Sequence, residues 1–597
     1  MTWTPTGLGL QIFQDRYARF EGETWEMACQ RVAFHVAGAE ENGKLQKYGE
    51  RFQEELVSNR FMPGGRIWYG SGRPKAQLLN CFVVPTSDSR EGWGKTVSDV
   101  IVVSGTGGGV GINCSPVRPR GSDIKGTGGK ATGAVSLMQM IDRVGDVLVG
   151  GGGRRLALML CLDVNHPDLE EFLNVKLNLS ELTNANISVV LNSETDAFIT
   201  AVRENLDLDF SFGGRTTGTS ISARKLWDTI VKNAWTSGEP GVLNGFEANR
   251  TNNIGYYKPL VSTNPCGEIW LEEYGCCCLG ALVLPRFVVD GKMDWDALDE
   301  SIRLGTRFLD DVLTVNHYPL PEIKDNCEKV RRIGLGVMGL HTMLLELGYK
   351  YSGDDGRAFI DKLFSFIKNT AYDSSINLAI EKGPFPAYDG RYLESGFVKT
   401  LKRGIRNKIK EYGIRNCASL TIAPTGTTGM VAGVSTGIEP LFAPVYYRHF
   451  YKPTDDGSRK LAKELVVTPE FERFGELAEG AYDVSVHDHF EIQKAVQAHV
   501  DNAVSKTINL PKNYPIEELA DVWLEYLPYL KGTTFYREGS REFEPLSPVR
   551  LDDALKMKRV PKAEEANYAE LNSMDCPEGV CEVPWVTSSM ALSSITN

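Results

Sequence analysis

A short stretch near the middle of the chain, Asn264-Pro-Cys-Gly-Glu268, places three reactive side chains at alternating positions. An amide, a thiol and a carboxylate at positions 264, 266 and 268 would face one side of an extended or looped backbone. Pro265 and Gly267 disfavour a helix or a central strand, so we expect a tight loop. A thiol between an amide and a possible base is typical of a catalytic site; the alternative is a buried structural cysteine beside a turn.

Cysteines recur at two other places. One is the run Cys276-Cys-Cys-Leu-Gly280, and the other is Cys81 within the apolar run 78–85. The second run is short and bounded by turn-forming residues, which predicts a buried strand. On these residues alone, a core cysteine is the favoured interpretation of Cys81.

Several loops could bind phosphate. The glycine-rich run 104–113 is not a Walker loop, because no Gly-Lys-Ser/Thr closes it. The glycines at 150–153 precede Arg154 and Arg155, which suits a moving loop, although a solvated basic turn is the alternative. The run Ala-Pro-Thr-Gly-Thr-Thr-Gly at 423–429 follows an expected strand at 418–422 and leads into an expected helix. Its amides and hydroxyls could bind an anion without a lysine, or could form an ordinary capped turn.

Together these motifs resemble the catalytic subunit of ribonucleotide reductases, in the family's order, over about residues 60 to 545. The similarity is greatest to the adenosylcobalamin-dependent group and its relatives among the iron- or manganese-dependent enzymes. The resemblance implies that Cys266 is the thiyl radical that takes the 3′ hydrogen of the ribose. It also implies that Glu268 is the general base on the 3′-hydroxyl and that Asn264 holds the sugar by hydrogen bonds.

The resemblance also implies two redox pairs. Cys81 and Cys277, the first residue of the Cys-x-Leu-Gly pattern, would supply two electrons and end as a disulfide. Cys576 and Cys581, on an expected mobile tail, would reduce that disulfide by thiol–disulfide exchange. Thioredoxin or glutaredoxin would in turn reduce the tail pair. Zinc binding by the tail pair would require two further ligands, and none is evident.

Nucleotide binding follows from the same resemblance. The substrate phosphates are assigned to Pro424, Thr425, Gly426, Thr427 and Thr428. A specificity effector, such as dTTP or another dNTP or ATP, is assigned to Asp88, Arg118 and Lys125, and Arg154 and Arg155 belong to the loop that relays effector identity. Arginine suits these roles because its guanidinium pairs with two phosphate oxygens at once.

The resemblance leaves two possible sources for the radical. Metal-dependent reductases carry two neighbouring tyrosines near the last barrel strand, whereas this chain has Phe535-Tyr536. The missing tyrosine favours adenosylcobalamin. The alternative is a metal or radical cofactor held by a ferritin-like partner subunit, with Tyr536 receiving the radical; no metal is expected in this chain.

Composition limits the remaining possibilities. The chain has 597 residues, 42% of them hydrophobic, and a net charge of −12, which argues against a general nucleic-acid or membrane binder. Twelve cysteines are too few for a disulfide scaffold of this length. With no signal peptide evident in the first residues, the prediction is a cytoplasmic enzyme, expected to be a homodimer because the family's specificity site lies at a subunit interface.

The expected fold is α/β: the family's ten-stranded α/β barrel, with a central finger loop that carries Cys266. Amphipathic helices at 24–37 and 45–57 predict a helical segment over 1–59, followed by the barrel at 60–545 and the tail at 546–597. The short first segment leaves no room for the family's regulatory ATP cone, and diphosphates are the favoured substrates. The weaker alternatives are a glycyl-radical enzyme, a non-catalytic nucleotide sensor, and a thiol–disulfide oxidoreductase, which would need the absent Cys-x-x-Cys.

Overall fold

Strands with nearly unbroken apolar sequences form the centre of the structure. The computed structural model describes residues 3–41, 43–150, 154–177, 181–453, 459–540 and 546–557. Strands β6 (Leu158–Asp163) and β7 (Ala185–Leu191) are buried along almost their whole length. Such burial is typical of parallel strands that are covered on both faces.

These two strands belong to a sheet of eight, in the order β13, β2, β3, β6, β7, β10, β21, β20. From β2 to β10 all neighbours are parallel; β21 runs antiparallel to β10 and parallel to β20. The bounds of the other strands are Cys276–Cys277 (β13), Cys81–Val83 (β2), Gly109–Asn113 (β3), Gly241–Asn244 (β10), Gly532–Arg537 (β21) and Thr507–Leu510 (β20).

A second sheet has three strands, in the order β1 (Phe61–Pro63), β14 (Leu279–Val283), β17 (Gly334–Met338). Strands β14 and β17 are parallel, and β14 follows β13 of the large sheet after one residue. The two sheets therefore adjoin at the cysteine run that was singled out in the sequence.

The hydrogen-bonded ladders do not close into a complete barrel. The expected strand at 418–422 makes only isolated parallel bridges, Leu335 to Leu420 and Ile422 to Val504, so its prediction as a regular strand is wrong. The cause is a side chain distant in the sequence: the buried Asp501 carboxylate accepts hydrogen bonds from the Ser419 and Leu420 amides at 2.7 and 2.8 Å. A side chain thus takes the amides that a continuous ladder would use.

The finger loop is a narrow hairpin between the two sheets. Strands β11 (Ser262–Thr263) and β12 (Trp270–Leu271) pair antiparallel, and residues 264–269 form the tip. On one side Asn113 of β3 donates to the Val261 carbonyl at 3.1 Å; on the other, Trp270 Nε1 donates to the Lys531 carbonyl at 3.0 Å. The base of the hairpin is therefore tied to β3 and to the residue that precedes β21, both in the large sheet.

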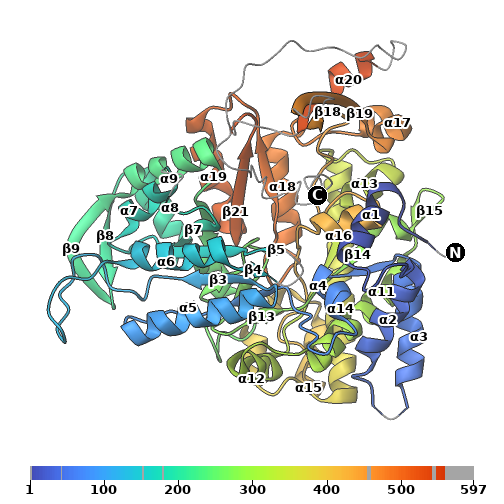
Figure 1. Ribbon diagram of the computed structural model, residues 1–597, viewed down its shortest axis with the longest axis horizontal. Helices are drawn as coiled ribbons and strands as arrows, with labels where there is room; N and C mark the ends of the chain where they lie inside the picture. Colours follow the sequence, from blue (N-terminus) through green and yellow to red (C-terminus); the bar gives the residue numbers. More distant parts are fainter. Residues whose placement is uncertain are drawn as a thin grey trace.

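Helices surround these strands (Figure 1). The two helices expected near the N-terminus are confirmed as α2 (Trp25–Ala37) and α3 (Leu45–Val57), and the Thr24 hydroxyl caps α2. Helix α1 (Gly7–Arg16) precedes them. The main helices elsewhere are α4 (Gly65–Gly70), α5 (Arg90–Gly105), α6 (Ala134–Val147), α9 (Ala223–Ser237), α11 (Trp295–Val315), α12 (Pro321–Val330), α14 (Asp354–Lys382), α16 (Gly426–Ala432), α18 (Val486–Gln497) and α19 (Ile516–Tyr526).

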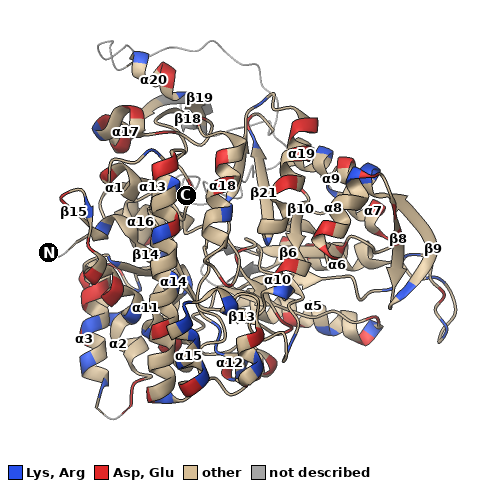
Figure 2. Ribbon diagram, turned by 180° about the vertical axis from the view of Figure 1, so that it is seen from behind, with Lys and Arg blue, Asp and Glu red and all other residues tan. Residues whose placement is uncertain are grey.

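Charged residues concentrate on the outer helices, while the central strands are largely uncharged (Figure 2). Among the described residues, no helix has the length and apolar character that crossing a membrane requires. The same residues contain no group of histidines, cysteines and carboxylates arranged to hold a metal ion.

Candidate active site

The tip of the finger loop folds as the sequence predicts, into a tight turn. The Gly267 amide donates to the Asn264 carbonyl at 3.0 Å, and Gly267 has a φ of 74°, which glycine adopts without strain. The tip is anchored through the Glu268 carbonyl, which accepts bonds from the Ala503 amide at 3.0 Å and from the Thr421 hydroxyl. Two segments distant in the sequence therefore fix the loop.

The amide, thiol and carboxylate of the loop are brought together. Asn264 Nδ2 donates to Glu268 Oε2 at 2.7 Å and contacts Cys81 Sγ at 3.1 Å. Asn264 and Glu268 are buried, whereas Cys266 is half-buried because it faces a cavity. Burial raises the pKa of Glu268 to about 7, and the bond from Asn264 partly opposes this rise. A carboxyl with this pKa can serve as a base near neutral pH.

Cys277 lies directly opposite Cys81, because β13 and β2 pair antiparallel with these two residues in register. Opposed residues of an antiparallel pair have Cα atoms about 4.5–5.5 Å apart, within the range that a disulfide spans. Burial, followed by the nearby Glu268 charge, raises the pKa of both thiols well above the usual range. Both cysteines are therefore neutral thiols at physiological pH.

The neighbouring cysteines have other surroundings. Cys276 pairs with Phe82 in the register, so its side chain is on the opposite face of β13 from Cys277. It lies against Cys327 of α12. Cys278 donates to the Leu309 carbonyl at 3.6 Å. None of the three cysteines of the run lines the cavity, and the strand register alone makes Cys277 the member that lies opposite Cys81.

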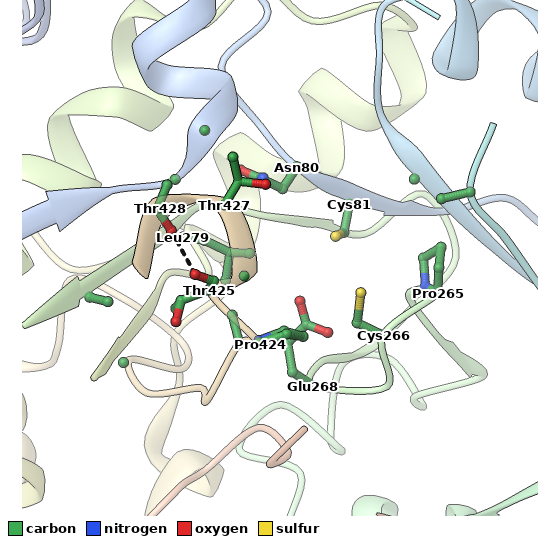
Figure 3. Close-up of a pocket in the computed structure, with 18 of the residues that line it drawn as sticks. Asn80, Cys81, Pro265, Cys266, Glu268, Leu279, Pro424, Thr425, Thr427 and Thr428 are labelled. Atoms are coloured by element: carbon green, nitrogen blue, oxygen red, sulfur yellow. Dashed lines mark hydrogen bonds between the residues drawn. The ribbon is translucent and has the colours of Figure 1, made fainter. Parts of the chain in front are cut away.

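A cavity of about 310 Å³ connects the finger loop with the expected phosphate loop. Cys81, Cys266 and Glu268 lie on one side of it and the threonines at 425, 427 and 428 on the other (Figure 3). All five residues assigned to the substrate phosphates line this cavity, namely Pro424, Thr425, Gly426, Thr427 and Thr428. No lysine or arginine of the described chain lines it.

The phosphate loop has an unusual backbone. Thr425 adopts a left-handed conformation, with a φ of 51°, just before α16. Its hydroxyl accepts a bond from the Gly437 amide at 2.7 Å, which holds the turn against the 435–442 segment. The first amides of a helix have no partner four residues earlier, so those of α16 can donate to a ligand.

Three residues that line the cavity have a buried polar atom without a partner. They are Asn80, Ser104 and Tyr17, whose Oδ1, Oγ and Oη respectively make no hydrogen bond. Sequence reasoning missed all three. The position of Asn80 beside Cys81 was a usable signal, whereas nothing local connects Tyr17, in the first helical segment, to this site.

A second cavity of about 90 Å³ also reaches Cys266. Tyr536 and Phe535 line it, as does Thr533, whose buried hydroxyl has no partner. Phe535 is buried and packs edge-on against Trp523, with ring centroids 4.4 Å apart. Cys266 therefore borders cavities on two sides.

The residues assigned to the effector lie outside both cavities. Arg118 Nε binds the Asp88 carboxylate at 2.9 Å, and Lys125 is exposed. Arg154 and Arg155 form β5, paired with β4 (Val149–Gly150), but residues 151–153 between these strands are outside the described ranges, and the arginine side chains are not described. Cys576 and Cys581 also lie outside the described residues.

Comparison with known families and proteins gives consistent matches. A model of the ribonucleotide reductase barrel domain matches residues 79–536, and a model of the ribonucleotide reductase all-alpha domain matches residues 4–76. The Vitamin B12-dependent ribonucleoside-diphosphate reductase of Mycobacterium tuberculosis (strain CDC 1551 / Oshkosh) is 35% identical over 574 residues, covering 89% of this chain and 78% of that protein. The protein of the same name from Thermoplasma acidophilum is 35% identical over 527 residues, covering 84% and 66%. The ribonucleoside-diphosphate reductase subunit alpha of Chlamydia pneumoniae is 26% identical over 503 residues, covering 74% and 48%.

Proposed function

Since the chain belongs to the ribonucleotide reductase family and is a catalytic subunit of it, we propose that its larger cavity reduces ribonucleoside diphosphates to 2′-deoxyribonucleoside diphosphates by thiyl-radical chemistry. The preference for diphosphates rests on the names of the relatives from Mycobacterium tuberculosis and Thermoplasma acidophilum. The observation that carries the proposal is that Cys266, Glu268 and Cys81 share one cavity with the threonine loop.

The finger loop supplies the first steps. Cys266, as a thiyl radical, removes the 3′ hydrogen atom of the ribose, while Glu268 accepts the proton of the 3′-hydroxyl. A pKa of about 7 suits Glu268 to this task, because a base near the working pH is both ionised and sufficiently basic. Asn264 orients the carboxylate through its 2.7 Å bond and holds the sugar.

Cys81 and Cys277 supply the reducing equivalents. Two S–H bonds break and one S–S bond forms, while the 2′-hydroxyl leaves as water and carbon 2′ gains hydrogen. Cys266 then returns the hydrogen atom to carbon 3′ and becomes a thiyl again, and Glu268 returns the proton to the 3′ oxygen. The raised pKa of both thiols keeps their protons available for this exchange. Cys576 and Cys581 then regenerate the pair by thiol–disulfide exchange, with thioredoxin or glutaredoxin as the outer donor.

The radical source is adenosylcobalamin, which when bound supplies the radical that converts the Cys266 thiol into a thiyl. The second cavity suits the nucleoside part of this cofactor, since it adjoins Cys266 and offers the unpartnered Thr533 hydroxyl. Phe535 supports this choice because it cannot relay a radical as a tyrosine can. The alternative is a ferritin-like partner subunit that delivers the radical through Tyr536.

Regulation and assembly follow the family. A dNTP or ATP effector binds Asp88, Arg118 and Lys125, and the loop that contains Arg154 and Arg155 relays its identity. The chain forms a homodimer in this proposal because the family's specificity site lies at a subunit interface. A reducing cytoplasm fits the cysteines of the described ranges, all of which are free thiols.

The architecture we propose is a ten-stranded barrel with the finger loop at its centre, preceded by a helical segment at 1–59 and followed by a tail at 546–597. Two parallel halves of five strands would meet through the isolated bridges and the junction of β13 with β14. Nine of its members would be strands, and the bridged 418–422 segment would take the tenth position; the strands are β2, β3, β6, β7, β10, β14, β17, β20 and β21.

The test is reduction of CDP by the purified chain, with dithiothreitol and a deoxynucleotide effector, with and without adenosylcobalamin. Turnover that requires adenosylcobalamin supports the full proposal, and Cys266→Ser should then abolish turnover while CDP still binds. Turnover that appears only when a metal-loaded partner subunit is added would move the radical source to the alternative. No turnover in any combination would refute the proposed activity.

A further inference from the structure

Tyr17 is held at the edge of the substrate cavity by the helical segment that precedes the barrel. It follows α1, and its amide donates to the Phe13 carbonyl at 2.9 Å. Its carbonyl accepts a bond from Arg31 at 3.2 Å, and the same guanidinium donates to the Trp68 carbonyl at 3.0 Å. Glu23 fixes Arg31 by an ion pair of 2.6 Å. The position of Tyr17 is therefore set by several bonds, not by packing alone.

The phenol of Tyr17 has an unused hydrogen-bonding group. The residue is 3% exposed, its Oη is buried without a partner, and the side chain lines the cavity that contains Cys266. A buried hydroxyl with no partner is unfavourable, since it has lost water without replacement. Such a group at a binding cavity is explained by a ligand that completes its bond.

Helix α1, which directly precedes Tyr17, packs against α16, the helix that begins at the threonine loop. A Cβ built at Gly9 of α1 would lie 2.7 Å from the Met430 carbonyl of α16, so the two helices touch at the backbone. Met430 also lines the cavity, and α16 begins at the threonine loop. Because no lysine or arginine of the described chain lines the cavity, phosphate must be bound there by neutral donors.

We propose that Tyr17 is a substrate-binding residue, whose hydroxyl donates a hydrogen bond to a phosphate oxygen of the ribonucleoside diphosphate. This inference rests on the proposed function and extends it, since the substrate site then includes a residue outside the barrel. The helical segment thereby contacts the phosphate end of the substrate directly.

The experiment compares Tyr17→Phe with the wild-type chain in direct binding of CDP, by calorimetry, and in steady-state kinetics. Removal of one donor to a charged oxygen should weaken CDP binding and raise KM by about tenfold or more, with kcat within about twofold. Inhibition by inorganic pyrophosphate should weaken by the same factor, because this probe carries the phosphates alone. The melting temperature should stay the same or rise slightly, since the variant no longer buries an unpartnered hydroxyl.

Tyr48→Phe is the matched control, because Tyr48 lies on α3 of the same helical segment and does not line the cavity. It should leave CDP and pyrophosphate binding unchanged. Unchanged CDP affinity in Tyr17→Phe would overturn the inference, and weaker CDP binding with unchanged pyrophosphate inhibition would overturn the assignment to phosphate. If wild-type chain binds CDP but never reduces it, the proposed reaction fails while the binding comparison still decides the role of Tyr17.

Discussion

Substitution of Asn264 by alanine should move the pH dependence of catalysis in a defined direction. Glu268 is buried, and its raised pKa of about 7 is the balance between burial, which favours the neutral acid, and the bond from Asn264, which favours the anion. The Asn264→Ala variant removes only the second influence. The pKa of Glu268 should therefore rise further, and more alkaline conditions should be needed to ionise the base.

The size of the shift follows from the contact. Asn264 Nδ2 lies 2.7 Å from Glu268 Oε2, and a hydrogen bond to a charged group contributes about 1.5–3 kcal/mol. One pKa unit corresponds to about 1.4 kcal/mol, so loss of the bond raises the pKa by about one to two units. The acid limb of the activity profile should move from about pH 7 to about pH 8 or 9.

The assay is kcat/KM for CDP from about pH 5.5 to 9.5, because this ratio reports ionisations of the free enzyme. Below its pKa the base is protonated, so wild-type activity should fall about tenfold per pH unit below pH 7. The pKa of Glu268 can also be measured without turnover. The infrared band of its protonated carboxyl group, obtained as the difference between the spectra of wild type and Glu268→Gln, is followed as a function of pH.

Two controls make the result decisive. The kcat/KM profile of Glu268→Gln should show no acid limb near pH 7, since the titrating carboxyl group is absent. Asn113→Ala loses a hydrogen bond to the finger loop at Val261, but Asn113 bonds to neither Asn264 nor Glu268. The acid limb of its kcat/KM profile should therefore stay at about pH 7. A limb that remains at pH 7 in Asn264→Ala, or that persists in Glu268→Gln, would refute this account of the base.

Three further predictions follow. Gly111→Ala would place a Cβ 1.7 Å from the Thr263 carbonyl, so it should lower the melting temperature by several degrees and reduce turnover at least tenfold. Gly94→Ala, in open space on α5, should leave turnover unchanged and keep or slightly raise the melting temperature, because alanine favours a helix more than glycine does. Tyr536→Phe should leave adenosylcobalamin-dependent turnover within about twofold; a total loss would indicate a radical route through this residue. Thr427→Val should raise KM for CDP about tenfold without changing kcat, because it removes a hydroxyl from the phosphate end, and an unchanged KM would contradict that placement.

Local patterns in the sequence were sufficient for the elements that depend on neighbouring residues. The helix at 24–37 is set by its apolar spacing and the Thr24 cap, and the loop at 264–268 by Pro265 and Gly267. The expected buried strand with Cys81 is β2. Gly267 has a positive φ, a conformation that glycine adopts without strain and that fits the tight loop predicted from Pro265 and Gly267.

Features that depend on distant residues were not predictable in this way. Apolar periodicity at 418–422 predicts a strand, but cannot reveal that Asp501, some eighty positions later, takes the amides of that segment. In the sequence, Tyr17 is one more apolar residue at the end of a helix. Only the packing of α1 against α16 in the folded chain brings it to the cavity. The family resemblance named the barrel residues in advance, but it did not extend to this residue.

Burial gives the site two properties that radical chemistry needs together. The same exclusion of water raises the pKa of Glu268 to about 7 and raises the pKa of Cys81, Cys266 and Cys277 well above the usual range of a thiol. A carboxylate can therefore accept a proton from the substrate while Cys81 and Cys277 beside it retain theirs. A solvated site would reverse both effects, since the carboxyl would be a weak base and part of the thiol population would ionise. Hydrogen-atom transfer requires intact S–H bonds, so the depth of the finger loop in the fold is a condition of the reaction.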